Sequence, residues 1–338
     1  MIVLQSYWIA ILFCVFAMIC WGSWQNTQKM VQKGWRFELF YWDLAVGIFF
    51  MATIAAFTVG SLGDSGRPFL EDLKQADPGS MLYAMLGGLL WNVGNLLLVA
   101  AISVAGMSVA FPIGGGIAWV LGIILNYMNI LLKGGIPSEH PIMLWGGIVF
   151  IVIAIVLSGK SYSNLSKTKK KTSFKGVFLS VLAGTFIAFF FPVVVNSFDP
   201  VFVGSGKGTL TPYSGVFFMA IGIVITTAIV NPFFMRKPVD GSPVRMSEYK
   251  SGTAKTHILG MLGGGIWALG TIFSYMAVGA ANPAIAYALS NAAPVVAIIW
   301  GLFVWKEFKG ATRGTNTLLL LMFIGYLIGL VLITMSNA

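Results

Sequence analysis

Charged side chains are scarce in this chain, at 9% of the residues. Soluble domains average about 25%, so this shortage excludes an ordinary soluble protein. The two cysteines, Cys14 and Cys20, lie in one apolar segment, where they point in different directions and cannot form a disulfide. The two histidines, His140 and His257, are isolated in the sequence, and no nucleophile–base combination is visible. We therefore predict no metal site, no cofactor and no enzymatic activity.

Hydrophobic residues take the place of charge and make up 57% of the 338 residues. A membrane-spanning helix needs about 20 predominantly apolar residues, and ten segments qualify. They are residues 8–28, 40–60, 80–102, 107–131, 141–159, 175–198, 213–235, 256–279, 283–305 and 316–335. The sequence therefore predicts an all-α integral membrane protein with ten transmembrane helices joined by polar loops.

Lysines and arginines are distributed unevenly over the predicted loops. Of the 21, all but Arg67, Lys74, Lys133 and Lys207 fall on one side of the membrane. Because basic loops are retained in the cytoplasm, we expect both termini outside the plasma (cell inner) membrane and the 160–174 loop in the cytoplasm. The net charge of +10 then needs no nucleic-acid partner, since the lipid bilayer explains it.

Two stretches of the chain are near copies of each other. Residues 85–95 read Met-Leu-Gly-Gly-Leu-Leu-Trp-Asn-Val-Gly-Asn, and residues 261–271 read Met-Leu-Gly-Gly-Gly-Ile-Trp-Ala-Leu-Gly-Thr. Five predicted spans precede the basic loop and five follow it, so the second set enters the membrane in the opposite orientation. We predict two inverted five-helix repeats, residues 1–159 and 175–338, joined by a cytoplasmic linker at 160–174.

Both copies place a tryptophan and a polar residue one helical turn apart. Trp91 precedes Asn95, and Trp267 precedes Thr271. Tryptophan in membrane helices prefers the interfaces, whereas these two lie near the centres of their spans, which favours a cavity between the repeats. The alternative is that the small residues around them serve only close helix packing.

Two spans carry helix-breaking residues at corresponding places. Residues 110–116 contain Pro112 and three successive glycines, and residues 290–294 end in Pro294. Irregular backbone within the membrane is tolerated only where protein or a cavity covers it. We therefore expect kinked or broken helices beside a transport site.

The polar side chains inside the spans are neutral or aromatic, and no lysine or arginine lies well inside a span. Burying an unpaired ion is expensive, so this composition favours an uncharged, planar or ring-shaped solute such as a sugar, a ureide or a nucleobase. Each asparagine could instead bridge two helices. The predicted substrate-binding residues are Trp21, Gln25, Trp91, Asn95, Trp119, Asn126, Trp267, Thr271, Tyr275 and Asn291.

Asp43 is the one acid expected within a span, near the cytoplasmic start of the second helix. An ionisable group in a membrane helix is a candidate proton site, and we predict that Asp43 couples transport to a proton gradient. The alternative is an interfacial acid that pairs with Lys29, Lys33 or Arg36.

Several stretches resemble the ureide permeases. They are Gly87–Asn95, Leu125-Asn126-Tyr127, Trp300-Gly301 with the following Lys306-Glu307 and Thr312-Arg313, and Trp21-Gly22-Ser23-Trp24 ahead of Asp43. That family belongs to the drug/metabolite transporter superfamily and is related to bacterial glucose, ribose and rhamnose porters. In plant members the central loop is longer and carries a nucleotide-loop-like motif, which is broken here.

The resemblance implies a secondary active importer with proton coupling and alternating access. It implies oxo-derivatives of nitrogen heterocycles, such as allantoin, uracil or xanthine, as substrates, and it implies Asp43, Asn95 and Asn126 as polar site residues. Two alternatives remain open, a monosaccharide–proton symporter for ribose, glucose or rhamnose, and an exporter of drugs or metabolites.

Overall fold

The computed structural model describes residues 1–165, 174–199, 207–239 and 241–338. Within these ranges the chain is helical and forms no β-strand beyond one isolated bridge. Ten helical segments are long and apolar enough to cross a membrane, which confirms the predicted fold class. The spans are Tyr7–Met30, Phe37–Phe57, Pro78–Ala105, Val109–Leu132, Pro141–Leu165, Phe174–Val195, Pro212–Arg236, Ala254–Ala281, Pro283–Val304 and Arg313–Met335.

Eight of the spans are single helices. They are α3 (Phe37–Phe57), α5 (Pro78–Ala105), α6 (Met107–Leu132), α7 (Pro141–Leu165), α8 (Phe174–Val195), α9 (Pro212–Arg236), α11 (Ala254–Ala281) and α14 (Arg313–Met335). The first and ninth spans are each assembled from shorter pieces. These are α1 (Tyr7–Ser23) with α2 (Asn26–Met30), and α12 (Pro283–Ser290) with α13 (Pro294–Ile299) and the π-helix η1 (Trp300–Val304).

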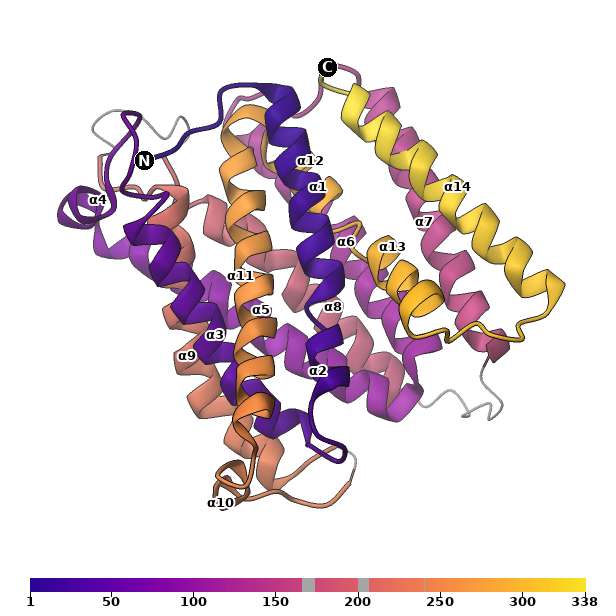
Figure 1. The fold of residues 1–338 in the computed structure, drawn as a ribbon. Coiled ribbons are helices and arrows are strands. Elements are labelled where there is room, and N and C mark those ends of the chain that lie inside the picture. Colours follow the sequence, from indigo (N-terminus) through magenta and orange to yellow (C-terminus); the bar gives the residue numbers. More distant parts are fainter. Residues whose placement is uncertain (166–173, 200–206, 240) are drawn as a thin grey trace.

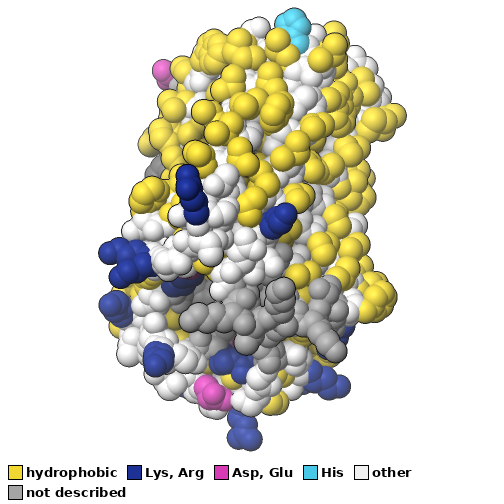
Figure 2. Space-filling view, turned by 90° about the vertical axis from the view of Figure 1, so that its right-hand side faces the viewer, with side chains coloured by type: hydrophobic (Ala, Val, Ile, Leu, Met, Phe, Trp, Pro, Cys, Tyr) yellow, Lys and Arg dark blue, Asp and Glu magenta, His cyan; other side chains and the backbone are white. Residues whose placement is uncertain are grey.

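Short helices occupy two of the loops, α4 (Phe69–Gln75) and α10 (Met246–Tyr249). Figure 1 shows the two chain ends at one end of the bundle and α10 at the other. We call these the terminal end and the α10 end. Figure 2 shows that lysine and arginine side chains gather toward the α10 end, whereas the upper part of the same face is mostly hydrophobic. Large exposed apolar side chains on the flanks, among them Phe50, Ile142 and Leu327, suit contact with lipid.

Several helices begin at a polar residue whose side chain caps the first turn. Asp77 precedes Pro78, and its carboxylate accepts a hydrogen bond from the backbone N–H of Ser80 at 2.8 Å. Thr253 caps α11 in the same way, accepting from the N–H of Thr256 at 3.2 Å. Each cap satisfies a backbone donor that has no partner inside its helix. Proline suits the first turn, because it lacks the N–H that would be unsatisfied there.

Glycines let equivalent helices of the two halves cross in backbone contact. A Cβ added at Gly88 of α5 would lie 2.1 Å from the carbonyl oxygen of Met219 in α9, and one added at Gly264 of α11 would lie 2.0 Å from that of Leu44 in α3. Gly88 and Gly264 are 176 residues apart, the same offset as the two copied stretches. Likewise, α5 packs on α8 as α11 packs on α1. These paired contacts are consistent with an inverted repeat.

Of the kink or break predicted at residues 110–116, the break is absent, since α6 runs without interruption through Pro112. Pro112 lies in the second turn of that helix, where the missing N–H removes one hydrogen bond near the end rather than in the middle. The corresponding break in the ninth span is present, because residues 291–293 form a turn between α12 and α13.

The linker expected at residues 160–174 falls largely outside the described residues, as do Lys167, Lys169, Lys170 and Lys171. The parts that are described are helical, because α7 continues to Leu165 and α8 begins at Phe174.

Candidate solute-binding site

A cavity of about 140 Å³ lies among the helices, on the α10 side of the tryptophans of the two copied stretches. Its walls come from α1, α5, α6, α8, α11 and the ninth span, so both halves of the chain contribute. Pockets for drug-sized ligands are roughly 300–1,000 Å³. We call this space the central cavity, and its size suits one small solute.

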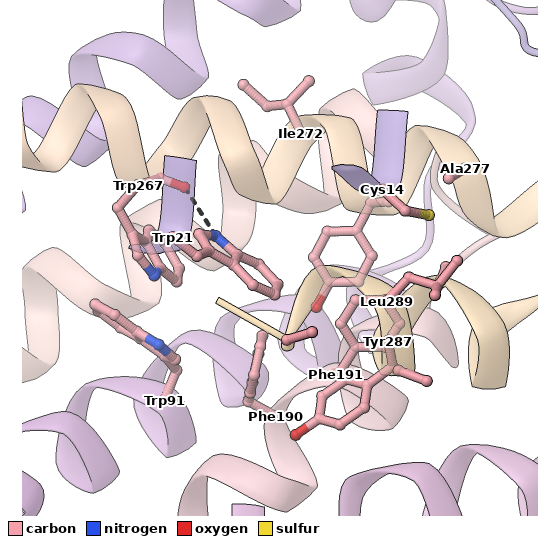
Figure 3. Close-up of a cluster of buried hydrophobic side chains, with 14 of the residues drawn as sticks. Cys14, Trp21, Trp91, Phe190, Phe191, Trp267, Ile272, Ala277, Tyr287 and Leu289 are labelled. Carbon is pink, nitrogen blue, oxygen red and sulfur yellow. Dashed lines mark hydrogen bonds between the residues drawn. The ribbon is translucent and has the colours of Figure 1, made fainter. Parts of the chain in front are cut away.

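Three tryptophans form one wall of the central cavity. The rings of Trp91 and Trp267 have their centroids 3.9 Å apart, and Trp21 stacks on Trp267 at 6.4 Å with an angle of 18°. Figure 3 shows Trp91, Trp267 and Trp21 grouped beside Phe190. The indole N–H of Trp21 donates to the carbonyl oxygen of Trp267 at 3.2 Å, which fixes one ring against the next helix. The tryptophans of the two copied stretches therefore meet at one place.

Gln25 provides an unengaged polar group in this apolar setting. It lies in the interruption between α1 and α2 and is exposed even though it is within a span, because it lines the central cavity. Within the described part of the chain its side-chain amide makes no hydrogen bond. The interruption is stabilised locally, since Thr27 donates to the carbonyl oxygen of Trp24 at 2.8 Å and Asn26 to that of Ser23 at 2.8 Å.

The interruption in the ninth span faces the one in the first. A Cβ added at Gly22 would lie 2.6 Å from the carbonyl oxygen of Ala293, so only glycine allows this approach. Asn291 lines the central cavity at the turn, and its amide nitrogen donates to the carbonyl oxygen of Tyr287 at 3.2 Å. Trp119, also in the wall, donates its indole N–H to Ala288 at 3.0 Å. The irregular backbone of both spans therefore borders a cavity. This is expected, because backbone groups freed from a helix cannot find hydrogen-bond partners in lipid.

Six of the ten predicted substrate-binding residues therefore line the central cavity. They are Trp21, Gln25, Trp91, Trp119, Trp267 and Asn291.

The other four predicted residues lie outside its wall. Asn95 donates to the hydroxyl of Tyr41 at 3.2 Å, and Asn126 donates to the carbonyl oxygen of Gly122 at 2.8 Å. Thr271 accepts from the indole of Trp21 behind the wall. Tyr275 stacks on Phe191 with centroids 4.4 Å apart, nearer the terminal end.

Aromatic side chains close the terminal end of the cavity. Phe190, Phe191, Tyr275 and Tyr287 are all at most 2% exposed and contact one another in a continuous cluster. Figure 3 shows Phe190, Phe191 and Tyr287 side by side next to the tryptophans.

On the opposite side, a second space of about 70 Å³ continues toward the α10 end. We call it the vestibule. It shares Gly22, Gln25 and Phe111 with the central cavity and reaches Lys29 and Glu307.

Asp43 lies away from the central cavity, in a second polar cluster near the α10 end. Its side chain is 3% exposed, and its carboxylate accepts hydrogen bonds from Nδ1 of His257 at 2.9 Å and from the hydroxyl of Tyr249. Burial, followed by the bond to Asp43, raises the pKa of Tyr249, so its hydroxyl stays protonated and donates. Trp35 lies edge-on to His257 at 5.7 Å.

The alternative pairing of Asp43 with neighbouring cations is wrong for two of the three candidates. Lys29 pairs with Glu307 at 2.5 Å, and Arg36 pairs with Glu38 at 2.7 Å. His257, which looked isolated in the sequence, is the partner instead, because α11 packs closely against α3. The approach is so close that a Cβ added at Gly260 would collide with the Cβ of Asp43. In the sequence, Gly260, one turn after His257, was the one indication that this face of the helix packs closely against another.

Among the described residues, no group of three or more His, Cys, Asp or Glu side chains could hold a metal ion.

Ten membrane-spanning helices, six of which enclose a solute-sized cavity, define the class as a multi-pass membrane transport protein. The sequence profile of the ureide permeases matches residues 40–175 and 165–336, which together cover most of the chain. The chain therefore belongs to the ureide permease family.

Individual relatives are distant in sequence, and two plant ureide permeases extend over nearly the full length. Ureide permease 1 of Arabidopsis thaliana is 24% identical over 100% of this chain and 99% of its own, and ureide permease 2 of the same plant is 25% identical over 93% of each. The glucose uptake protein GlcU of Bacillus subtilis is 24% identical over 68% of this chain and 70% of its own. A protein crystal structure aligns with 97% of this chain and 99% of its own at TM-score 0.57 and 16% identity, which shows a shared fold.

Proposed function

We propose that this protein is a secondary active transporter that imports a small neutral ureide or nucleobase by alternating access. The observation that carries the proposal is the exposed, unengaged amide of Gln25 inside a cavity walled by aromatic rings and by small or aliphatic residues. Rings cover the apolar faces of a planar solute, and an amide both donates and accepts hydrogen bonds. Allantoin, uracil and xanthine carry matching C=O and N–H groups.

The lack of charge in the cavity supports a neutral solute. None of the described side chains that line the central cavity is ionisable as an acid or a base. An ionic solute would be buried there without a counter-charge, which is unfavourable. The small volume also argues against a broad drug exporter, which needs room for ligands of many shapes.

A monosaccharide is the second candidate, since a glucose uptake protein is among the relatives. Tryptophan rings can also cover the C–H face of a sugar. A sugar ring, however, carries many hydroxyl groups, and among the described residues of the cavity wall only Gln25 and Asn291 have side-chain amides. The ureide or nucleobase therefore fits the described wall better.

A ligand screen on the purified protein tests the substrate class. A solute that binds the folded state raises the melting temperature by mass action. We expect stabilisation by at least one of allantoin, uracil and xanthine, and none by ribose, glucose or rhamnose at the same concentration. A response to sugars alone would replace the ureide proposal by the monosaccharide one, and a response to neither group would favour an exporter.

Proton coupling is proposed to reside in the cluster of Asp43, His257 and Tyr249. A carboxylate and an imidazole 2.9 Å apart can share or exchange a proton, and both sit on helices that span the membrane. A change in their protonation can affect the central cavity through movement of α11. The helix that carries His257 also carries Trp267, and its glycines hold it in backbone contact with the helix of Asp43. A shift of α11 therefore moves one wall of the solute site.

The proposed orientation places the α10 end in the cytoplasm of a cell with this protein in its plasma membrane. The gathering of lysine and arginine at that end supports it (Figure 2). In intact cells, a membrane-impermeant thiol reagent is expected to label Ser65→Cys, in the loop before α4, and to spare Ser251→Cys, after α10. Cys14 and Cys20 are first replaced by alanine. Labelling of position 251 but not 65 would reverse the orientation.

A further inference from the structure

Three polar side-chain contacts join the first span to the ninth and to the residues just after it at the α10 end. They are Trp300 to Ser23, with an Nε1–Oγ distance of 2.8 Å, Trp305 to Asn26, with an Nε1–Oδ1 distance of 2.5 Å, and Lys29 to Glu307, with an Nζ–Oε1 distance of 2.5 Å. Ser23, Asn26 and Lys29 are spaced three residues apart and so share one face of the first span. We call these six residues the polar seam.

The polar seam borders the vestibule. Asn26, Lys29 and Glu307 line that space, which opens from the central cavity past Gln25. The side chains of Lys29 and Glu307 are 44% and 31% exposed, so their outer sides face the surroundings. Lys29 also lies over the ring of Trp305 at 5.2 Å. The seam is therefore the boundary between the vestibule and the α10 surface.

The ninth-span side of the seam is built from short pieces. The turn at residues 291–293 is followed by the six-residue α13, which passes directly into the five-residue η1, so the helix changes from α to π geometry. Mid-helix irregularities and π-helical turns mark places where a helix can bend. At the aromatic cluster of the terminal end, α8 and α11 each run as one unbroken helix, although Pro192 lies inside α8 beside Phe191.

We propose that the polar seam is the gate between the central cavity and the α10 end. It opens when residues 294–307 move away from the first span about the turn at 291–293, and the solute then passes through the vestibule. An ion pair that is partly exposed contributes little to stability, which suits a contact that breaks in every cycle. This proposal rests on the transport role of the central cavity.

Accessibility of the vestibule tests the gate. Ser158 lines the vestibule and is 4% exposed, and Ser158→Cys in a chain without Cys14 and Cys20 serves as the reporter. Charge reversal by Lys29→Glu or by Glu307→Lys places like charges together in the seam. We expect each to raise the rate of modification by a charged thiol reagent about tenfold, because like charges repel where the pair attracted. The double variant Lys29→Glu/Glu307→Lys is expected to return the rate to that of the unaltered seam.

A second reporter position and a milder substitution distinguish opening of the gate from misfolding. Ser251→Cys, exposed at the same end, should react at one rate in all seam variants. Trp305→Phe keeps the ring but removes the donor to Asn26, and a two- to threefold rise at position 158 is expected. Unchanged rates at 158 in the single variants, or no return in the double variant, would overturn the gate. The labelling test is independent of the solute screen, because labelling needs no solute. A failed screen would therefore not affect the test of the gate.

Discussion

Replacing Gln25 with leucine is expected to weaken solute binding by about 10- to 100-fold without unfolding the protein. Leucine has a similar length but cannot hydrogen-bond. Removing one partner of a hydrogen bond, so that a polar group of the buried solute is left unpaired, costs about 1–3 kcal/mol, where about 1.4 kcal/mol is a factor of ten. Because the amide of Gln25 bonds to no described residue, the loss should appear in the dissociation constant and not in the melting temperature of the free protein. Titration calorimetry with the best solute of the screen measures the dissociation constant, and thermal unfolding without solute measures the melting temperature.

Gln28→Leu is the matched control, since Gln28 lies one turn further along in α2 and lines neither the central cavity nor the vestibule. We expect its dissociation constant to stay within about twofold of the original, because surface substitutions usually change energies by under about 0.5 kcal/mol. Equal affinities for Gln25→Leu and the unaltered protein would remove Gln25 from the site. The solute would then have to be held by the tryptophan wall and Asn291 alone.

The spans and the duplicated stretch could be predicted because both are local properties of the sequence. Span length depends on runs of apolar residues, and the offset between Gly88 and Gly264 is visible by inspection. A tryptophan far from the interface also predicts a cavity, since the indole needs a polar or planar partner there. The meeting of Trp91 and Trp267 follows from their matching positions in the two halves.

Side-chain direction around a helix was harder to predict. Asn95 is one turn from Trp91, yet it bonds to Tyr41, because α3 lies on that side of α5 and offers a hydroxyl. The partner of Asp43 is more than 200 residues away in sequence, so no local pattern identifies it. The interruption at Trp24 and Gln25 has no proline to announce it in the sequence, and it lies where Gly22 packs against the ninth span.

The stretch at Pro112 illustrates the opposite error. Proline and three glycines predict a kinked or broken helix from propensity alone. In the structure α6 continues, and Gly114 and Gly122 instead allow close approach of Leu98 and Tyr287. Glycine in a membrane helix often serves packing, and sequence alone does not separate that role from a break. The two interruptions that are present both border the central cavity, where a solute can satisfy freed polar groups.

Replacing Asp43 with asparagine is expected to abolish proton-driven accumulation while leaving exchange of solute across the membrane. Asparagine keeps the shape and can still bond to Tyr249 and His257, but it cannot take up a proton. For one proton per solute, a gradient of one pH unit supplies about 1.36 kcal/mol, enough for a roughly tenfold concentration ratio. In proteoliposomes the original protein should approach that ratio, and Asp43→Asn should stay near one. Counterflow, in which unlabelled solute inside drives labelled solute in, needs no proton and should persist.

Glu38→Gln is the matched control for the loss of one negative charge, because Glu38 lies at the same end of α3 and pairs with Arg36 rather than with His257. Accumulation by Glu38→Gln should remain close to the original ratio. His257→Gln should resemble Asp43→Asn if the carboxylate and the imidazole act as one proton site, since removing either partner leaves the other without the group that shares its proton. Full accumulation in Asp43→Asn would place the coupling elsewhere. Loss of counterflow together with accumulation would instead assign Asp43 to holding α3 against α11, a structural role that its contact with Gly260 also permits.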